Sequence, residues 1–208
     1  VTIAAFANAP HTSHTEQFIV RALRDAGELT LSIVAEEHGQ VVGHVALSPV
    51  TITNDHGHKA KGWCGLGPIS VLPQRQGHGI GSRLMEQALS ELRAMQAAGC
   101  VLLGDPAYYG RFGFQAHAGL QLPGVPPGYF VALALHGSVL VRLLALNTGR
   151  GHGRARICVS PRPGRNDLGA VLVAVVPSPQ AKRPGRGRGA CLRRGSSGQR
   201  LGGFIRHC

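Results

Sequence analysis

The glycines at 77, 79 and 81 stand between a β-branched run and a strongly helical one. The first amide N–H groups of a helix have no intrahelical partner, and the helix dipole adds partial positive charge there. Because glycine has no side chain, a phosphate can approach such N–H groups closely. The segment therefore predicts an anion site. It is not a P-loop, since no Gly-Lys-Ser/Thr follows, nor the usual dinucleotide fingerprint, since the preceding strand ends in Pro73.

This glycine loop must be positioned by the elements on either side of it. The run "WCGLGPISVLP" (63–73) is rich in strand formers, although glycine and proline within 65–68 mark a bulge or a close approach of another backbone. Residues 79 to about 96 predict a helix whose apolar stripe contains Ile80, Leu84, Ala88, Leu92 and Met95. The apolar run at 100–105 predicts a short buried strand. These segments together predict a right-handed βαβ crossover with two parallel strands.

The other segments before residue 136 show both helix and strand patterns. Residues 14–27 predict a helix that places Phe18, Ile19, Ala22 and Leu23 on one face and that Gly27 can close. Two β-rich runs, 29–37 and 40–52, are separated by a turn and predict a hairpin. A short helix entering a strand is expected at 106–114, and a last strand at 126–135. This order of elements predicts a mixed α/β fold.

Charge is distributed unevenly along the chain. Residues 1–136 hold 8 Lys/Arg and 9 Asp/Glu, whereas residues 137–208 hold 14 Lys/Arg and one acid, Asp167. The second segment also contains 13 Gly, 5 Pro and a single aromatic residue, so it has little apolar surface to offset the cost of ordering. We predict a domain at 1–136 and a largely disordered basic tail at 137–208, in which only 168–176 has a strand pattern.

Cysteine usage and hydropathy favour a cytoplasmic protein. The five cysteines are widely spaced without a C-x-x-C pair, so reduced thiols are expected. The N-terminal residues lack the pattern of a signal peptide. The apolar run at 129–146 is broken by His136, Gly137 and Arg142, so we interpret its start as a buried strand and expect no membrane span. The His-x-His in the polar loop at 55–58 lacks further ligands, and we expect no metal.

Two motifs resemble those of a known family. Gln74-Arg75-Gln76-Gly77-His78-Gly79, followed by "IGSRLM", resembles the pyrophosphate-binding motif of the GNAT superfamily of N-acetyltransferases. "YGRFGF" (109–114) looks like the family's tyrosine-plus-Gly-Phe signature, in the family's order and at a typical separation. The longer string "GDPAYYGRFGF" is similar to that of a bacterial subgroup. The resemblance covers about residues 1–136 and implies a GNAT-type central mixed sheet flanked by helices.

The resemblance implies acetyl-CoA as cosubstrate, lying where two parallel strands splay apart. By analogy these strands end near Leu72 and Gly104, and the irregularity at 65–68 independently fits such an opening. Main-chain groups of Ile69 and Val71 are expected to pair with the pantetheine arm. The backbone N–H groups expected to hold the pyrophosphate belong to Gln76, Gly77, His78, Gly79, Ile80, Gly81 and Ser82.

The implied reaction is transfer of an acetyl group to a primary amine of an unidentified small molecule or peptide. The amine must be neutral, the developing oxyanion needs a donor such as a backbone N–H of the bulged strand, and the leaving thiolate needs a proton. Tyr109 occupies the family's general-acid position, and Tyr108 ranks second. The general base is left open among His44, Glu37, Asp105 and His117.

Both ends of the chain depart from the family pattern. "VTIAAFANA" (1–9) already has a helical pattern, so we expect the family's N-terminal strand to be missing and an edge strand to be left unpaired. The tail at 137–208 is explained either by a shifted reading frame or by a genuine basic arm that binds nucleic acid. The alternatives to an acetyltransferase are a CoA-binding protein without efficient turnover and a nucleic-acid-binding protein acting through this tail. A homodimer is also left open.

Overall fold

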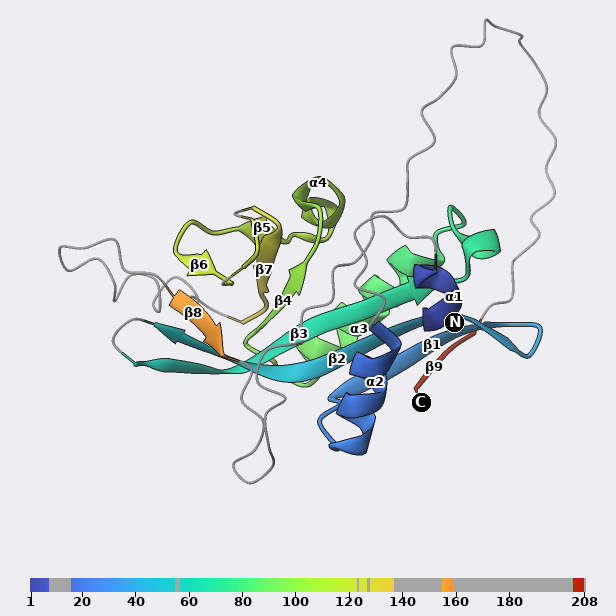
Figure 1. Ribbon diagram of the computed structural model, residues 1–208, viewed down its shortest axis with the longest axis horizontal. Coiled ribbons are helices and arrows are strands. Elements are labelled where there is room, and N and C mark those ends of the chain that lie inside the picture. The colour runs from blue at the N-terminus through green and yellow to red at the C-terminus, as the bar shows by residue number, and fades with distance from the viewer. Residues whose placement is uncertain are drawn as a thin grey trace, which may run out of the picture.

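The computed structural model describes residues 1–7, 16–54, 57–122, 124–126, 128–136, 155–158 and 204–207 (Figure 1). The helices are α1 (Thr2–Phe6), α2 (Glu16–Asp25), α3 (Ile80–Ala94) and α4 (Pro106–Tyr109), with 3-10 turns η1 (Pro73–Arg75) and η2 (Gly110–Phe112). The strands are β1 (Leu31–Glu37), β2 (Gln40–Asn54), β3 (Lys59–Val71), β4 (Gly99–Leu103), β5 (Gln115–Ala116), β6 (Leu120–Gln121), β7 (Phe130–Ala134), β8 (Ala155–Cys158) and β9 (Phe204–His207).

The strands form one mixed sheet in the order β5-β7-β4-β3-β2-β1-β9, with β8 pairing to β2 and β6. β1, β2 and β3 are antiparallel neighbours, and β3 pairs with β4 in parallel. The chain passes from β3 to β4 through α3, so the predicted strand–helix–strand unit with parallel strands is confirmed. Helix α3 covers one face of the sheet, and α1 and α2 lie on the opposite face (Figure 1). The predicted mixed α/β fold is thus confirmed.

Helix α3 packs one apolar stripe onto its face of the sheet. Ile80, Leu84, Ala88 and Leu92 are buried as the stripe predicts, together with Met85 and Leu89. Met95 was expected in the same stripe, and this is wrong because α3 ends at Ala94 and the Met95 side chain is 52% exposed.

Helix α2 buries a face one position away from the predicted one. Ile19, Val20 and Leu23 are buried, whereas Phe18 is 64% exposed, so Phe18 does not belong to the buried face that contains Ile19 and Leu23. At about 100° per residue, Phe18 and Val20 lie on opposite sides of Ile19, and the buried face of α2 includes the side of Val20. Gly27 follows the helix with a φ of +67°, a left-handed conformation that favours glycine and ends the helix as predicted.

The edge of the sheet at β1 is not unpaired, which corrects the expectation from the N-terminal sequence. β9 pairs antiparallel with β1, from Ile33 facing His207 to Glu36 facing Phe204. The His207 Nε2 also lies 3.2 Å from the Glu91 Oε1 of α3, which ties the added strand to the helix. β9 and β8 both come from 137–208, where the sequence pattern predicted neither; the strand predicted at 168–176 lies outside the described residues.

The apolar run at 129–146 begins as the buried strand β7, as expected. Its continuation from residue 137 lies outside the described residues. Within the part of the chain that the structure describes, no helix combines the length and the apolar character needed to cross a membrane.

Candidate active site

The two central parallel strands are paired along only part of their length. Their register contains three pairs: Trp63 with Gly99, Cys64 with Cys100, and Gly65 with Val101. Beyond Gly65, β3 continues to Val71 while β4 continues to Leu103, and the two ribbons diverge (Figure 1). The predicted splaying of these strands is confirmed.

A β-bulge in β3 lies where this pairing ends. In the register of β2 and β3, Val45 faces Ile69 and Leu47 faces Leu66. β3 therefore has one residue more than β2 between these two pairs, which is a bulge at 67–68. The irregularity predicted from glycine and proline at 65–68 is confirmed.

Alternation along β3 sets the direction of its main-chain groups beyond the bulge. The Leu72 N–H donates to the Val42 carbonyl at 2.9 Å, so residue 72 belongs to a hydrogen-bonded pair with β2. In an antiparallel ladder such pairs alternate, so the N–H and C=O groups of Ile69 and Val71 point away from β2, toward the side of β4. The Val71 carbonyl accepts a hydrogen bond from the Gln76 Nε2 at 3.1 Å, so this side chain currently occupies one of those groups.

The glycine loop presents main-chain N–H groups to solvent at the start of α3. Gly77 and Gly79 have φ values of +79° and +78°, and Gly79 is the N-cap of the helix. The first helical hydrogen bond is donated by the Arg83 N–H to the Gly79 carbonyl at 3.0 Å. The N–H groups at 80–82 therefore have no acceptor within the helix, and residues 76–79 are exposed. The loop has the geometry of an anion site.

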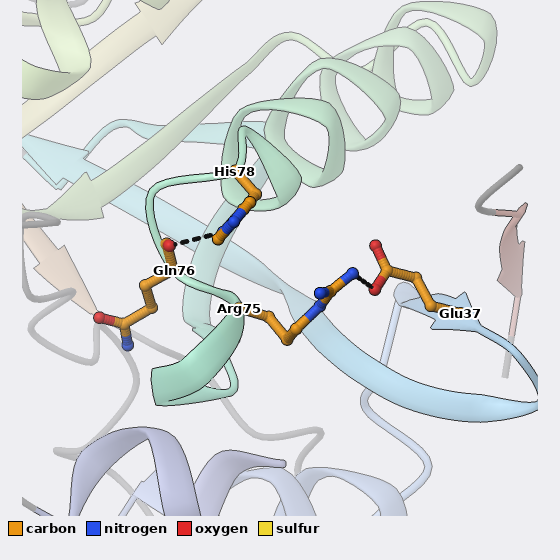
Figure 2. A network of polar contacts seen from close by, with 4 residues as sticks. All are labelled: Glu37, Arg75, Gln76 and His78. Carbon is orange, nitrogen blue, oxygen red and sulfur yellow. Dashed lines mark hydrogen bonds and ion pairs between the residues drawn. The ribbon is translucent and has the colours of Figure 1, made fainter. Parts of the chain in front are cut away.

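Side chains of the loop fix its shape (Figure 2). The Arg75 guanidinium forms an ion pair with Glu37, so the charge of Arg75 is directed to the β1–β2 hairpin. The His78 Nδ1 lies 2.9 Å from the Gln76 carbonyl oxygen, which turns the imidazole back onto its own loop. The Gln76 side chain extends away from His78, and its Nε2 donates to the Val71 carbonyl of β3.

Helix α4 follows β4 and holds the two tyrosines. Asp105 caps it, its Oδ1 accepting a hydrogen bond from the Ala107 N–H at 2.9 Å. Tyr109 is fully buried. Its ring packs edge-on against the rings of Tyr108 and Phe114, with centroid-to-centroid distances of 4.8 Å and 6.2 Å. Its hydroxyl has no hydrogen-bond partner among the described residues. Burial raises the pKa of Tyr109 well above its ordinary value, and the charge of Arg111 opposes this shift.

Tyr108 and Arg111 connect the wall formed by β4 and α4 to the wall formed by β3 and α3. The Tyr108 hydroxyl lies 3.8 Å from the position that a Cβ on Gly81 would take. The Arg111 Nη2 donates to the Ser82 Oγ at 3.0 Å. The sequence motif contains Arg111, but only its tyrosine and its Gly-Phe pair were given a role, so this contact was missed. A cation two residues after the site tyrosine was the signal for it.

The four residues left open as general base do not lie in one place. His44 is buried and its Nε2 lies 3.0 Å from the Ser32 Oγ; burial, with help from the Arg24 charge, lowers its pKa to about 4. Glu37 is paired with Arg75 and Asp105 caps α4, so both have structural roles. His117 follows β5, and partial burial lowers its pKa. Of the polar loop at 55–58, Asp55 and His56 lie outside the described residues.

Comparison with known proteins gives one family. The family model described as an acetyltransferase (GNAT) domain matches residues 28–116. An uncharacterized N-acetyltransferase, YhbS from Escherichia coli K12, is 38% identical over 125 residues, which are 60% of this chain and 72% of the relative. A GNAT family acetyltransferase from Brucella melitensis, solved in complex with acetyl-CoA, is 50% identical with a TM-score of 0.55, covering 66% of this chain and 79% of that one. The Escherichia coli YhbS structure, in complex with CoA, is 32% identical with a TM-score of 0.56, covering 74% and 81%.

The chain belongs to the GNAT family of acetyltransferases. The membership expected from the glycine loop and the "YGRFGF" motif is confirmed, and with it the enzyme class, an acetyl-CoA-dependent acyltransferase. In this GNAT domain the matched region, 28–116, spans β1 to β5 and so contains both walls described above.

Proposed function

We propose that the protein transfers an acetyl group from acetyl-CoA to a primary amine of a small molecule or peptide. The diphosphate of the donor is held by main-chain N–H groups of the glycine loop, from Gln76, Gly77, His78, Gly79, Ile80, Gly81 and Ser82. Three features support this assignment: the left-handed glycines, the first-turn N–H groups without helical acceptors, and the exposure of 76–79.

The pantetheine arm is proposed to lie along the open side of β3. Ile69 and Val71 direct their main-chain groups toward the side on which β4 has diverged, so they can pair with an amide-containing chain as a strand does. Because the Gln76 side chain now bonds the Val71 carbonyl, we expect this side chain to rotate when the arm binds. Binding therefore exchanges one hydrogen bond for another at Val71.

Tyr109 is proposed as the general acid. Acetyl-CoA supplies an activated thioester, and attack by a neutral amine requires that negative charge be stabilised at the carbonyl oxygen and then at the leaving sulfur. A main-chain N–H at the bulge of β3 is proposed as the donor to the oxyanion. The Tyr109 hydroxyl then donates its proton to the departing thiolate, and the proton lost by the acylated amine returns Tyr109 to its neutral form, so the products are the amide and free CoA thiol. Its raised pKa keeps the phenol protonated, so the proton to be transferred is present across the physiological pH range.

The single observation that carries this proposal is the buried Tyr109 hydroxyl, which has no hydrogen-bond partner within the described part of the chain. A buried hydroxyl that lacks a hydrogen bond is costly, so the place of this one beside the diverging strands calls for an explanation. The Tyr109 side chain lies against Gly104, which follows β4, and against the rings of Tyr108 and Phe114, so we assign the missing partner to a ligand bound in this region.

The test is acetyl-CoA turnover with a panel of primary amines, measured by release of free thiol. We expect Tyr109→Phe to lower kcat by about 100-fold or more, a typical contribution of a positioned proton donor, while CoA still raises the melting temperature. Tyr108→Phe serves as the matched control and is expected to keep most of kcat. Full activity of Tyr109→Phe would remove the acid role; CoA binding without turnover by the wild type on every amine would favour a binding protein.

We also propose that residues 1–136 form the catalytic domain and that the protein works in the cytoplasm. Cys64 and Cys100 face each other across β3 and β4 as free, buried thiols, as a reducing compartment allows. Limited proteolysis that cuts first within 137–208 supports the domain boundary. Recovery of the protein with the membrane or secreted fraction of cells would contradict the location.

A further inference from the structure

Arg111 bridges the two walls of the proposed cofactor site. It lies in η2, after α4, and therefore belongs to the wall that begins with β4. Its Nη2 donates to the Ser82 Oγ at 3.0 Å, and Ser82 lies in the first turn of α3 on the other wall. Through this bond to Ser82, the guanidinium is held beside the first turn of α3, whose N–H groups at 80–82 have no helical acceptor.

Aromatic stacking orients the Arg111 guanidinium. Its Cζ lies 3.9 Å from the centroid of the Tyr108 ring and 4.8 Å from that of Phe112. A guanidinium has five N–H donors in one plane, and the bond to Ser82 uses one of them. Arg111 is exposed, so its remaining donors are available to an anion at the mouth of the site.

Arg75, which precedes the glycine loop, does not supply the same positive charge as Arg111. Its guanidinium is directed to Glu37 and forms an ion pair there (Figure 2). An anion on the first turn of α3 therefore meets main-chain N–H groups and Arg111, while the charge of Arg75 is already compensated.

We propose that Arg111 binds the diphosphate of the acyl donor and closes the mouth of the site over it. This inference rests on the proposed function and adds a side-chain ligand to the main-chain site. Ser82 acts as a positioning residue, because its hydroxyl holds the guanidinium across the opening before the donor arrives. Planar guanidinium groups bind phosphate oxygens with paired, charge-assisted hydrogen bonds, which fits a ligand carrying two linked phosphates.

The test compares donors with and without phosphate in Arg111→Gln, Arg111→Lys and a control, Arg83→Gln. Arg83 is also exposed and one residue from Ser82, but the adjacent position on a helix points to another side. For Arg111→Gln we expect kcat/KM with acetyl-CoA to fall about 10- to 100-fold, from the loss of hydrogen bonds to a charged group. With S-acetylpantetheine, which has no diphosphate, we expect kcat/KM to change less than about twofold. Arg111→Lys restores part of the loss, and Arg83→Gln matches the wild type.

Several outcomes would overturn the inference. Equal losses with acetyl-CoA and S-acetylpantetheine would assign Arg111 a structural role through Tyr108. Acetyl-dephospho-CoA lacks only the 3′-phosphate, so a loss that disappears with this donor would place Arg111 at that phosphate and not at the diphosphate. Melting temperatures of all variants check the fold. If the wild type neither binds CoA nor uses acetyl-CoA, the proposed function itself fails; if it does both and Arg111→Gln is unaffected, only this inference fails.

Discussion

The two walls of the candidate site are built in opposite ways. The first, the glycine loop and the start of α3, is exposed at 76–79 and offers main-chain N–H groups, with glycines providing the backbone conformation. The second, from Gly104 to Phe114, is a cluster of aromatic side chains around the buried Tyr109. A substitution on the first wall therefore acts through backbone conformation, whereas one on the second acts through packing.

The largest effect is expected from Gly104→Ala on the aromatic wall. A Cβ at this position would lie 2.2 Å from the Tyr109 Cε2, so the ring must move. We expect kcat to fall about 100-fold, since displacing a catalytic group by about 1 Å can have that effect, and the fold to lose about 1–3 kcal/mol from overpacking. Gly110→Ala is the control, because a Cβ there has no described atom within 4 Å. Equal rates for the two variants would show that the position of Tyr109 is unimportant.

A lower pH is expected to reduce folding stability through His44, which lies in neither wall of the site. Gly43 faces α3, so His44 faces the opposite side of the sheet. Its pKa is lowered from 6.5 to about 4, so below pH 6.5 the unfolded chain binds a proton that the folded chain refuses. Stability is therefore full above pH 6.5 and declines by about 3 kcal/mol as the pH falls toward 4. Urea unfolding followed by the fluorescence of Trp63, the single tryptophan, measures this. His44→Gln should show a flatter profile, and an unchanged one would contradict the assignment.

The smallest effect is expected on the glycine loop. Gly79→Ala places a side chain on a residue with a φ of +78°, which costs about 1–2 kcal/mol and distorts the first turn of α3. We expect CoA affinity to fall about tenfold and stability to fall by about that cost. Gly81→Ala is the matched control, since its Cβ would make ordinary contacts at 3.7 and 3.8 Å. Calorimetric titration with CoA distinguishes them, and equal affinities would argue against a backbone-built site.

The sequence predicted the first wall better than the second. Glycine spacing, the bulge at 65–68 and the start of α3 are local features, and each was confirmed. The role of Arg111 depends on contacts with Ser82 and Tyr108, which the chain brings together only through the divergence of β3 and β4. A local sequence pattern could not predict that contact.

Tertiary packing also explains the errors in the fold. Phe18 and Val20 are both apolar, and only the position of α2 on the sheet decides that Val20 is buried. The pairing of β9 with β1 joins segments near opposite ends of the chain. The four residues "FIRH" contain no turn signal and no hydrophobic periodicity that would predict it. The strand predicted at 168–176 stays a prediction.

The late strand β9 has a consequence for how the sheet assembles and opens. Ile33 meets His207 across almost the whole length of the chain, and contacts between such distant residues form slowly and are poorly supported by local structure. The central ladder of β2 and β3 is short-range and should form earlier. Amide protons of β1 that face β9 should therefore exchange with deuterium sooner than those of the same strand that face β2. One strand would then show two protection levels, one for each neighbour.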